Sequence, residues 1–394
     1  MANNAELYAR AQAVLFQNYR TQPIALVRGE GTSVWDADGR QYLDFIGGIA
    51  TVSVGHANPR VRAALVEQAG LLWHASNLYV TEPQIRLAEK LTAQTPSLKR
   101  VFFCNSGTEA NEAMIKLARH WHYANGRKER IEIVCFHNSF HGRTMGSLAA
   151  TGQPKYQTGF GPLPEGFRFL DYGDEAQLEA AIGDKTCAVL LEAVQGEAGV
   201  MVPQPSFLRK VRELCTKHGA LMLVDEVQTG MGRTGRFFAH QHFGIEPDAI
   251  SLAKGIAGGM PLGALMARDE VAQVFKPGTH ASTFGGNPLA TAAACAVVDL
   301  LLDGVLDNVR RMGELLSARL KAIPGAAGER GMGLLRGLLL AADGAPAVVT
   351  RARELGLLVN AIGERVIRLA PPLTVSEAEV ERATALLAQA LRPA

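Results

Sequence analysis

The chain has 394 residues, of which 47% are hydrophobic, and 40 lysines and arginines stand against 38 aspartates and glutamates. A chain of this length buries about three quarters of its surface on folding, so it needs neither disulfides nor a structural metal for stability. The formal net charge of +2 excludes a strongly basic nucleic-acid-binding protein and a protein dominated by an acidic disordered tail.

The location of the protein is indicated by its N-terminus and its cysteines. The first residues lack the basic-then-apolar pattern of a signal peptide, and no run reaches the ~18 apolar residues of a membrane span. The cysteines are widely spaced and odd in number, at positions 104, 135, 187, 215 and 295. We therefore expect buried, reduced thiols in a cytoplasmic protein with no membrane or nucleic-acid partner.

Residues 24–46 predict a small antiparallel sheet. Alternating runs are separated by turn signals at Gly29–Gly31 and at Asp38–Gly39.

The middle of the chain alternates short apolar runs with longer amphipathic ones. Continuous apolar strands separated by helices are typical of a mostly parallel sheet covered on both faces. We therefore predict an α/β, doubly wound fold. Strands are expected at residues 100–104, 131–136, 187–194, 220–224, 248–252 and 264–267, and helices at 108–122, 175–182 and 205–218.

The last hundred residues have a different pattern, which predicts a separate α+β unit. Helices are expected at residues 287–303, 310–323 and 375–391, and strands at 334–341 and 367–369.

Ser106, Gly107, Thr108 and Glu109 follow the first apolar strand directly. Ser106 and Glu109 have the spacing of a capping box. Glycine allows close approach of a ligand to the backbone, and the free N–H groups of a first helical turn bind anions. The segment is either a phosphate site or an ordinary helix cap.

Asp225 and Lys254 each follow an apolar strand. A carboxylate at the carboxyl end of a parallel strand lies where such sheets bind ligands, although an aspartate there also caps turns. Lys254 lies among apolar residues and glycines, where desolvation lowers the pKa of an amine and makes it more nucleophilic. The alternative is a lysine whose ammonium reaches solvent.

Three further patterns are weaker. Residues 230–235 match the GxGxxG fingerprint of dinucleotide-binding proteins, but the glycines begin five residues after the strand and little room for a helix follows. His137 and His141 lack a third ligand, so no metal site is expected. Arg368 lies in an apolar run, which predicts either a buried ion pair or a carboxylate-binding guanidinium.

Read together, these segments resemble the class III pyridoxal-phosphate aminotransferases. The resemblance covers nearly the whole chain, and its motifs occur in the family's order. They are FFCNSGTEANEAMIKLAR, FHGRTMGSLAATG, EAVQGEAGV, LVDEVQTGMGRTGRFFAHQHFGIEPDAISLAKGIAGGMPLGA (residues 223–264), STFGGNPLA and IRLAPPLTVS.

The resemblance implies a fold type I transferase that binds pyridoxal 5'-phosphate. Residues 56–290 would form the large cofactor-binding domain, and residues 1–55 and 291–394 would form the two parts of the smaller domain. Lys254 would carry the cofactor as a Schiff base and transfer the proton, and Asp225 would pair with the ring nitrogen. The other cofactor-binding residues it implies are Ser106, Gly107, Thr108, Phe140, Val227, Gln228 and, from the second subunit of a homodimer, Thr283.

Within the family, the resemblance is greatest to the branch that acts on N2-acetyl-L-ornithine and 2-oxoglutarate in arginine biosynthesis. It is carried by residues 19–50 and by the segment FHGRTMGSLAATGQPKY. It implies that Arg143 and Ser282 contact the acetylornithine end. Arg368 would bind the α-carboxylate of glutamate, and Glu197 would pair with Arg368 when the other donor is bound.

Alternatives remain open within the family and outside it. N-succinyl-L,L-2,6-diaminopimelate is a further donor to consider. Ornithine, succinylornithine and 4-aminobutyrate are the alternative substrates of related aminotransferases. A nicotinamide-dependent oxidoreductase that uses residues 230–235 is the alternative of another class.

Overall fold

The computed structural model describes residues 2–392. Its largest sheet consists of β4 (Arg100–Cys104), β5 (Glu132–Phe136), β6 (Phe167–Leu170), β7 (Thr186–Glu192), β8 (Leu221–Asp225), β9 (Ala249–Leu252) and β10 (Gly263–Ala267). The strand order is β4-β10-β9-β8-β7-β5-β6. The six strands expected in this region are present, and β6 is one that the patterns do not predict, because an arginine interrupts its short apolar run.

The sheet is parallel except at β10, which is antiparallel to both of its neighbours, β4 and β9. The segment 253–262 that joins β9 to β10 is shorter than the dozen or so residues that a parallel crossover needs. The chain therefore reverses direction at this point.

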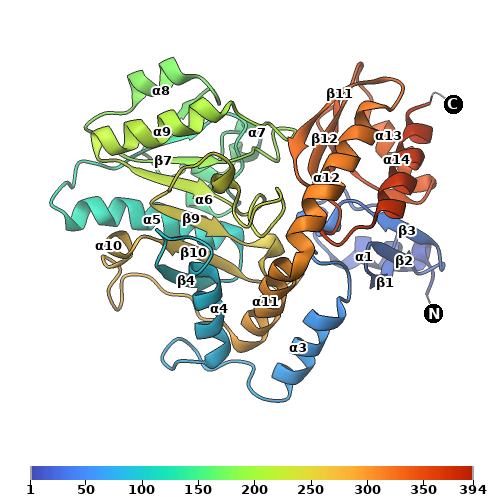
Figure 1. Cartoon of the computed structure of the whole chain (residues 1–394), viewed down its shortest axis with the longest axis horizontal. Helices are drawn as coiled ribbons and strands as arrows, with labels where there is room; N and C mark the ends of the chain where they lie inside the picture. Colours follow the sequence, from blue (N-terminus) through green and yellow to red (C-terminus); the bar gives the residue numbers. More distant parts are fainter. Residues whose placement is uncertain (1, 393–394) are drawn as a thin grey trace.

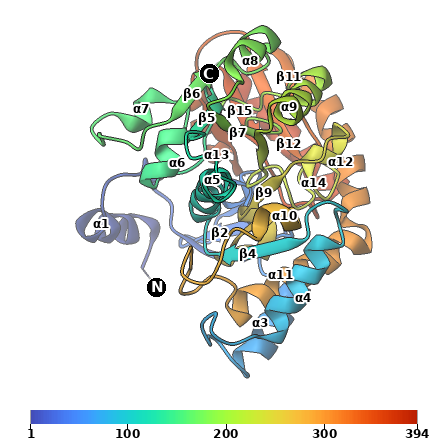
Figure 2. The same cartoon turned by 90° about the vertical axis from the view of Figure 1, so that its left-hand side faces the viewer.

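Helices cover both faces of this sheet. α5 (Gly107–Ala124) and α10 (Asp269–Ala272) pack on one face, and α8 (Glu175–Ala181) and α9 (Pro205–His218) pack on the other (Figures 1 and 2). Alternate residues of one strand point to opposite faces: Ile133 and Cys135 belong to the core under α5, and Val134 and Phe136 to the core under α9. The predicted α/β class is confirmed.

A second sheet joins the two ends of the chain. β1 (Leu26–Glu30), β2 (Ser33–Asp36) and β3 (Gln41–Asp44) form the expected antiparallel piece. β13 (Leu357–Leu358) then pairs in parallel with β3.

The third sheet is formed by the C-terminal part of the chain. It consists of β11 (Ala326–Met332), β12 (Leu335–Leu340), β15 (Val366–Leu369) and β14 (Asn360–Ile362), in that order. α12 (Leu306–Lys321), α13 (Ala345–Glu354) and α14 (Glu377–Leu391) accompany it. Figure 1 shows this sheet beside the N-terminal strands, on the side of the molecule away from the large sheet. The domain boundaries after residues 55 and 290 stay a prediction.

The remaining elements are short or peripheral. They are α1 (Asn4–Val14), α2 (Gly47–Ala50), α3 (Pro59–Ala69), α4 (Glu82–Thr92), α6 (Met145–Ala150), α7 (Pro154–Gln157), η1 (Ala239–His242) and η2 (Lys254–Ala257). α1 projects from the body of the molecule and buries none of its residues (Figure 2). All five cysteines are buried and free.

One helical segment is longer than expected. α11 (Pro288–Leu300), η3 (Leu301–Val305) and α12 run on as one piece, Pro288–Lys321, whose most apolar 18-residue window has a mean hydropathy of 1.9. The prediction that no segment is long and apolar enough to span a membrane is therefore wrong by length and composition. More than half of that window is buried, and α11 packs against α3 and α4, so this is a core helix.

Candidate active site

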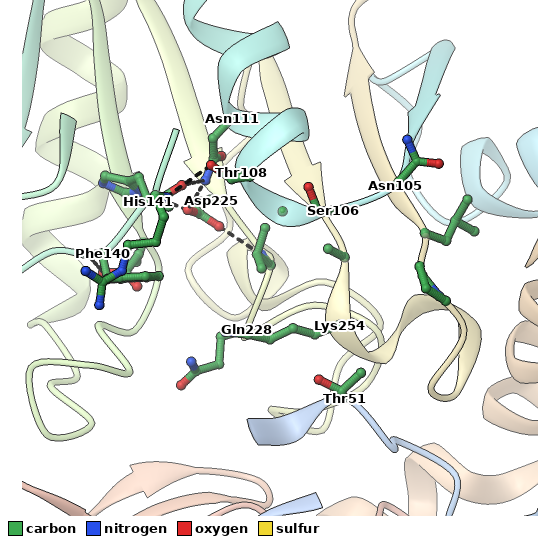
Figure 3. Close-up of a pocket in the computed structure, with 18 of the residues that line it drawn as sticks. Thr51, Asn105, Ser106, Thr108, Asn111, Phe140, His141, Asp225, Gln228 and Lys254 are labelled. Carbon is green, nitrogen blue, oxygen red and sulfur yellow. Dashed lines mark hydrogen bonds and ion pairs between the residues drawn. The ribbon is translucent and has the colours of Figure 1, made fainter. Parts of the chain in front are cut away.

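A cavity of about 410 Å³ lies at the carboxyl ends of the strands of the large sheet (Figure 3). β4, β5, β7, β8 and β9 all run in one direction, so the residues that follow them meet at one edge of the sheet. The cavity brings together the sequence-predicted residues Ser106, Gly107, Thr108, Phe140, Arg143, Asp225, Val227, Gln228 and Lys254.

Asp225, the last residue of β8, is held by three hydrogen bonds. Its Oδ2 accepts one from Asn111 Nδ2 at 2.7 Å and contacts His141 Nδ1 at 2.8 Å (Figure 3). Its Oδ1 accepts one from the backbone N–H of Val227 at 2.9 Å. The carboxylate is 4% exposed, so its orientation is fixed while it borders the cavity.

Lys254 begins η2, directly after β9, and its side chain lies in the cavity wall. Its φ of 46° is in the left-handed region, which costs energy for a residue other than glycine. Within residues 2–392, its Nζ has no hydrogen-bond or ion-pair partner. Burial lowers the pKa of Lys254 below its usual 10.5, although the Glu197 carboxylate acts in the opposite direction.

The first turn of α5 forms another wall. Ser106 is its N-cap, and Ser106 Oγ accepts a hydrogen bond from the Glu109 N–H. The second half of the predicted capping box is absent: the Glu109 carboxylate accepts from the Asn105 N–H instead of the Ser106 N–H. A Cβ on Gly107 would lie 2.7 Å from Cγ1 of Val227, so only glycine fits there.

Arg368 and Glu197 form an ion pair that lies next to the cavity. Arg368 Nη1 is 2.5 Å from Glu197 Oε1, and the arginine is 4% exposed. Burial tends to raise the pKa of Glu197, but the charge and hydrogen bond of Arg368, together with the Lys254 charge and the Gln228 hydrogen bond, hold that pKa below its usual value. Gln228, which lines the cavity, accepts a hydrogen bond of 3.4 Å from Arg368.

The structure does not bring Ser282 and Thr283 into the cavity. Ser282 Oγ accepts a hydrogen bond from Asn105, which does line it. Thr283 instead lines a separate small hollow with His74 and Thr81. In one protomer, therefore, Thr283 is away from Lys254.

Five further polar residues line the cavity and were not predicted from the sequence: Thr51, Asn105, Asn111, His141 and Glu192. Glu192 ends β7 directly beside Asp225 in the register, and an acid at the end of an apolar run was its signal in the sequence. Burial, followed by the Asp225 charge, raises the pKa of Glu192 well above its usual range. Asn111 has no local signal, because its contact with Asp225 spans 114 residues.

The GxGxxG segment forms a turn-rich loop after β8. It leads into η1, a four-residue 3-10 helix. A pyrophosphate site of the dinucleotide type needs the N-terminus of a helix at the glycines, and this loop does not supply one.

Comparisons with known proteins agree with one another. A model of the family Aminotransferase class-III matches residues 15–391. The acetylornithine aminotransferase of Myxococcus xanthus is 50% identical over 382 residues, which are 95% of each chain. The N-acetylornithine aminotransferase from Stenotrophomonas maltophilia K279a has a TM-score of 0.83 at 38% identity, covering 97% of this chain and 98% of that one.

A second solved structure is the ornithine aminotransferase from Toxoplasma gondii, whose crystals have PLP at partial occupancy in the active site. It has a TM-score of 0.94 at 34% identity and covers 98% of this chain and 94% of that one. The chain belongs to the class III aminotransferases. It is thus a pyridoxal-phosphate-dependent enzyme of fold type I, as the sequence resemblance implied. Class III membership excludes the nicotinamide-dependent alternative.

Proposed function

We propose that this aminotransferase moves the δ-amino group of N2-acetyl-L-ornithine to 2-oxoglutarate, a step of arginine biosynthesis. The products are N-acetyl-L-glutamate 5-semialdehyde and L-glutamate. Relatives such as that of Myxococcus xanthus bear the name of this activity at 50% identity. The observation that carries the proposal is a pair of arginines in different states: Arg143 exposes its guanidinium at the cavity, and Arg368 is masked by Glu197.

The cavity has the groups that pyridoxal phosphate needs. Bound there, the cofactor supplies an electron-withdrawing ring that stabilises negative charge on the substrate carbon beside the reacting nitrogen. Asp225 would hold the ring nitrogen protonated by its opposite charge. The first turn of α5, with Ser106, Gly107 and Thr108, would bind the phosphate, and Thr283 of a second subunit would complete that site.

The flat ring also needs neighbours above, below and at its edge. We assign Phe140 and Val227 to its two faces and Gln228 to the neighbourhood of its hydroxyl. All three line the cavity.

Lys254 is assigned two tasks. Its unpartnered amine would bond to the cofactor's aldehyde, and it would then take the proton from the substrate carbon that carries the reacting nitrogen. Both tasks need a neutral amine, and the lowered pKa of Lys254 increases the neutral fraction.

The Glu197–Arg368 pair lets one cavity accept two substrates. Acetylornithine reacts at an amine far from its carboxylate, which Arg143 and Ser282 would bind while Glu197 keeps Arg368 neutralised. Glutamate and 2-oxoglutarate carry a carboxylate next to the reacting carbon. Glu197 would then turn away, and the substrate carboxylate would take its place on Arg368. A buried guanidinium is costly when it is unpaired, so Arg368 would have one carboxylate or the other as its partner.

A homodimer in the cytoplasm is part of this proposal. Large apolar side chains are exposed on the protomer, including Leu71, Trp73, Leu78 and Tyr79. Monomers rarely expose many of these together. Phe284, next to Thr283, is exposed as well.

A panel of amino donors with 2-oxoglutarate tests the substrate. We expect the highest kcat/KM with N2-acetyl-L-ornithine, with N-succinyl-L,L-2,6-diaminopimelate also accepted. Ornithine is the alternative with structural support, given the TM-score of 0.94 to an ornithine aminotransferase. Faster turnover of ornithine, succinylornithine or 4-aminobutyrate would reject the proposed donor.

The assignment of Lys254 has a test of its own. Borohydride should remove the cofactor's visible absorption band and leave a mass tag on the peptide that contains Lys254. Lys254→Ala should abolish transamination. A tag on another lysine would contradict the assignment.

A further inference from the structure

Arg143 is held in an unusual way for an arginine beside a ligand cavity. Within residues 2–392, its guanidinium has no carboxylate or hydrogen-bond acceptor. Its backbone N–H donates to Thr108 Oγ1 at 3.2 Å. The guanidinium carbon lies 3.9 Å from the centre of the Tyr156 ring and 5.5 Å from the centre of the Phe140 ring. Aromatic faces, and no anion, therefore determine where this cation lies.

Tyr156 is the nearer of the two rings, and it packs against Phe140 of the cavity wall. Its ring meets that of Phe140 edge-on, with centres 5.8 Å apart and planes at 85°. Within residues 2–392 its hydroxyl has no hydrogen-bond partner, so the ring makes the contacts. Tyr156 does not itself line the cavity but packs on Phe140, which does, and it comes from the short helix α7, outside the cofactor motifs.

The two glutamines that flank Tyr156 fix α7 in place. Gln153 donates from its side chain to the carbonyls of Asn138 and Ser139, each at 3.2 Å. Gln157 donates to the carbonyls of Leu148 and Thr151 at 3.0 and 2.9 Å. The ring of Tyr156 is thus carried by a segment bonded to the loop that follows β5, the loop that bears Phe140 and Arg143.

We propose that Tyr156 is a positioning residue that holds Arg143 for the carboxylate of the amino donor. This inference rests on the proposed function, which assigns that carboxylate to Arg143. A ring face attracts a guanidinium without using any of its N–H donors. All five remain available for a planar, bidentate contact with a carboxylate.

The two arginines of the site are consequently held by different means. Glu197 neutralises Arg368 and must move before Arg368 can bind a carboxylate. Tyr156 holds Arg143 and does not compete with the substrate. The enzyme therefore has one carboxylate-binding arginine that is always available and one that is exposed only for the second substrate.

Two variants of Tyr156 test this inference, with two donors. Tyr156→Leu removes the ring face, and Tyr156→Phe keeps it. With N2-acetyl-L-ornithine, we expect Tyr156→Leu to raise KM about five-fold with kcat changed less than about two-fold. Tyr156→Phe should match the unchanged enzyme, because the hydroxyl makes no hydrogen bond within residues 2–392.

The second donor is N-acetyl-1,4-diaminobutane, which has the same chain and reacting amine but no carboxylate. Its kcat/KM should be the same in both Tyr156 variants. An equal loss with both donors would mean that Tyr156 acts only on general structure, and an unchanged KM for acetylornithine would mean that the ring does not hold Arg143. Either result overturns the inference.

Two controls separate this inference from the proposed function. Arg143→Gln should raise KM for acetylornithine more than Tyr156→Leu does. If Arg143→Gln has the effect and Tyr156→Leu does not, the role of Arg143 stands and that of Tyr156 falls. If neither variant changes KM, the assignment of Arg143 itself is wrong. Phe160→Leu, an exposed aromatic residue of the same segment, controls for a loosened loop, and the cofactor absorption band controls for loading.

Discussion

Lys254 combines a strained backbone with an unpartnered side chain. Its φ of 46° persists because the rest of η2, including Ile256 and Ala257, is buried and fixes the backbone there. The side chain therefore stays in the cavity wall next to the carboxylates of Glu197, Asp225 and Glu192. Burial outweighs these charges, and the pKa of the amine lies below 10.5.

This lowered pKa predicts how cofactor-free protein recaptures pyridoxal phosphate. Only the neutral amine attacks an aldehyde, so the rate should rise with pH and level off above the pKa of Lys254. We expect the midpoint below that of Nα-acetyl-lysine, measured by recovery of the absorption band across a pH series. A midpoint equal to or above that of Nα-acetyl-lysine would contradict the effect of burial.

Glu192 gives a second prediction at this scale. Its pKa is raised in the folded protein, so the folded state holds a proton that the unfolded state has released. The stability that depends on this proton is lost as pH rises from the usual glutamate range through the raised value. Glu192→Gln, which resembles the protonated acid, should stabilise cofactor-free protein more at pH 8 than at pH 5. Urea unfolding measures this, and a gain that is equal at both pH values would contradict it.

At the scale of elements, the GxGxxG loop connects the large sheet to the C-terminal sheet. Arg233 Nη1 donates to the carbonyls of Leu334 and Pro371 at 3.0 and 2.6 Å. The Leu334 N–H donates back to the Arg233 carbonyl at 3.0 Å. These two residues flank β12 and β15 at the same end, close to Arg368. Arg233 has no carboxylate partner in the described part of the chain, and burial lowers its pKa to about 9.

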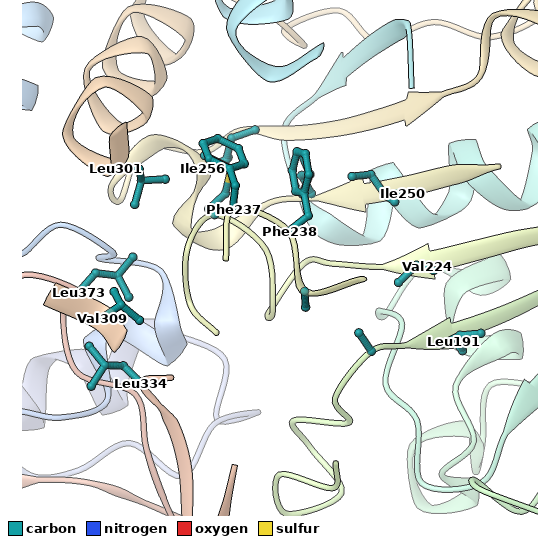
Figure 4. Close-up of a cluster of buried hydrophobic side chains, with 14 of the residues drawn as sticks. Leu191, Val224, Phe237, Phe238, Ile250, Ile256, Leu301, Val309, Leu334 and Leu373 are labelled. Atoms are coloured by element: carbon teal, nitrogen blue, oxygen red, sulfur yellow. The ribbon is translucent and has the colours of Figure 1, made fainter. Parts of the chain in front are cut away.

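Apolar side chains surround this connection. Figure 4 shows Phe237, Phe238 and Ile256 from the large-sheet side near Leu301, Val309, Leu334 and Leu373. The residues that resemble a nucleotide fingerprint thus serve to join two sheets.

Arg233→Met should therefore destabilise the protein. It leaves two carbonyls without their donor, at a cost of about 2 kcal/mol in the free energy of unfolding. Arg310→Met is a matched control, because Arg310 donates to the Gly235 carbonyl of the same loop from a half-exposed position. We expect a loss below about 1 kcal/mol for it. If denaturant unfolding shows equal losses of unfolding free energy for the two variants, the buried hydrogen bonds of Arg233 contribute no more than the exposed one of Arg310.

At the scale of the whole molecule, the protomer exposes apolar side chains where residues 66–80 cover its surface. Leu78 is 86% exposed, Val80 83% and Leu71 74%. His74 of this segment contacts Phe284, which follows Thr283. An interface at this surface would place Thr283 next to a second protomer, which fits its absence from the cavity of its own chain.

Leu78→Asp should shift the proposed dimer towards a monomer of 42.1 kDa, because a buried, unpaired carboxylate opposes association. Affinity for pyridoxal phosphate should fall with it, since Thr283 of the partner is then lost. Sedimentation velocity and equilibrium dialysis measure the two effects. Ile131→Asp, at another exposed apolar position, should change neither, and a dimeric Leu78→Asp would place the interface elsewhere.

Local patterns predict much of this protein because burial and capping act over a few residues. Continuous apolar runs mark β5, β7, β8 and β9, since strands covered on both faces have no polar side to show. The residues that follow such strands are therefore candidates for the site, and Asp225 and Lys254 were found in this way. The assignment of tasks to them came from the family resemblance.

Packing decides the features that no local pattern records. The direction of β10, the contact of Asn111 with Asp225 and the hold of Tyr156 on Arg143 all join segments that lie far apart or meet across a loop. Arg368 shows the limit clearly: its apolar neighbours predict either an ion pair or a ligand site, and they do not reveal its partner Glu197, which lies 171 residues away in the sequence. Such contacts form only when whole elements pack against one another, so no short stretch of sequence contains the interactions that stabilise them.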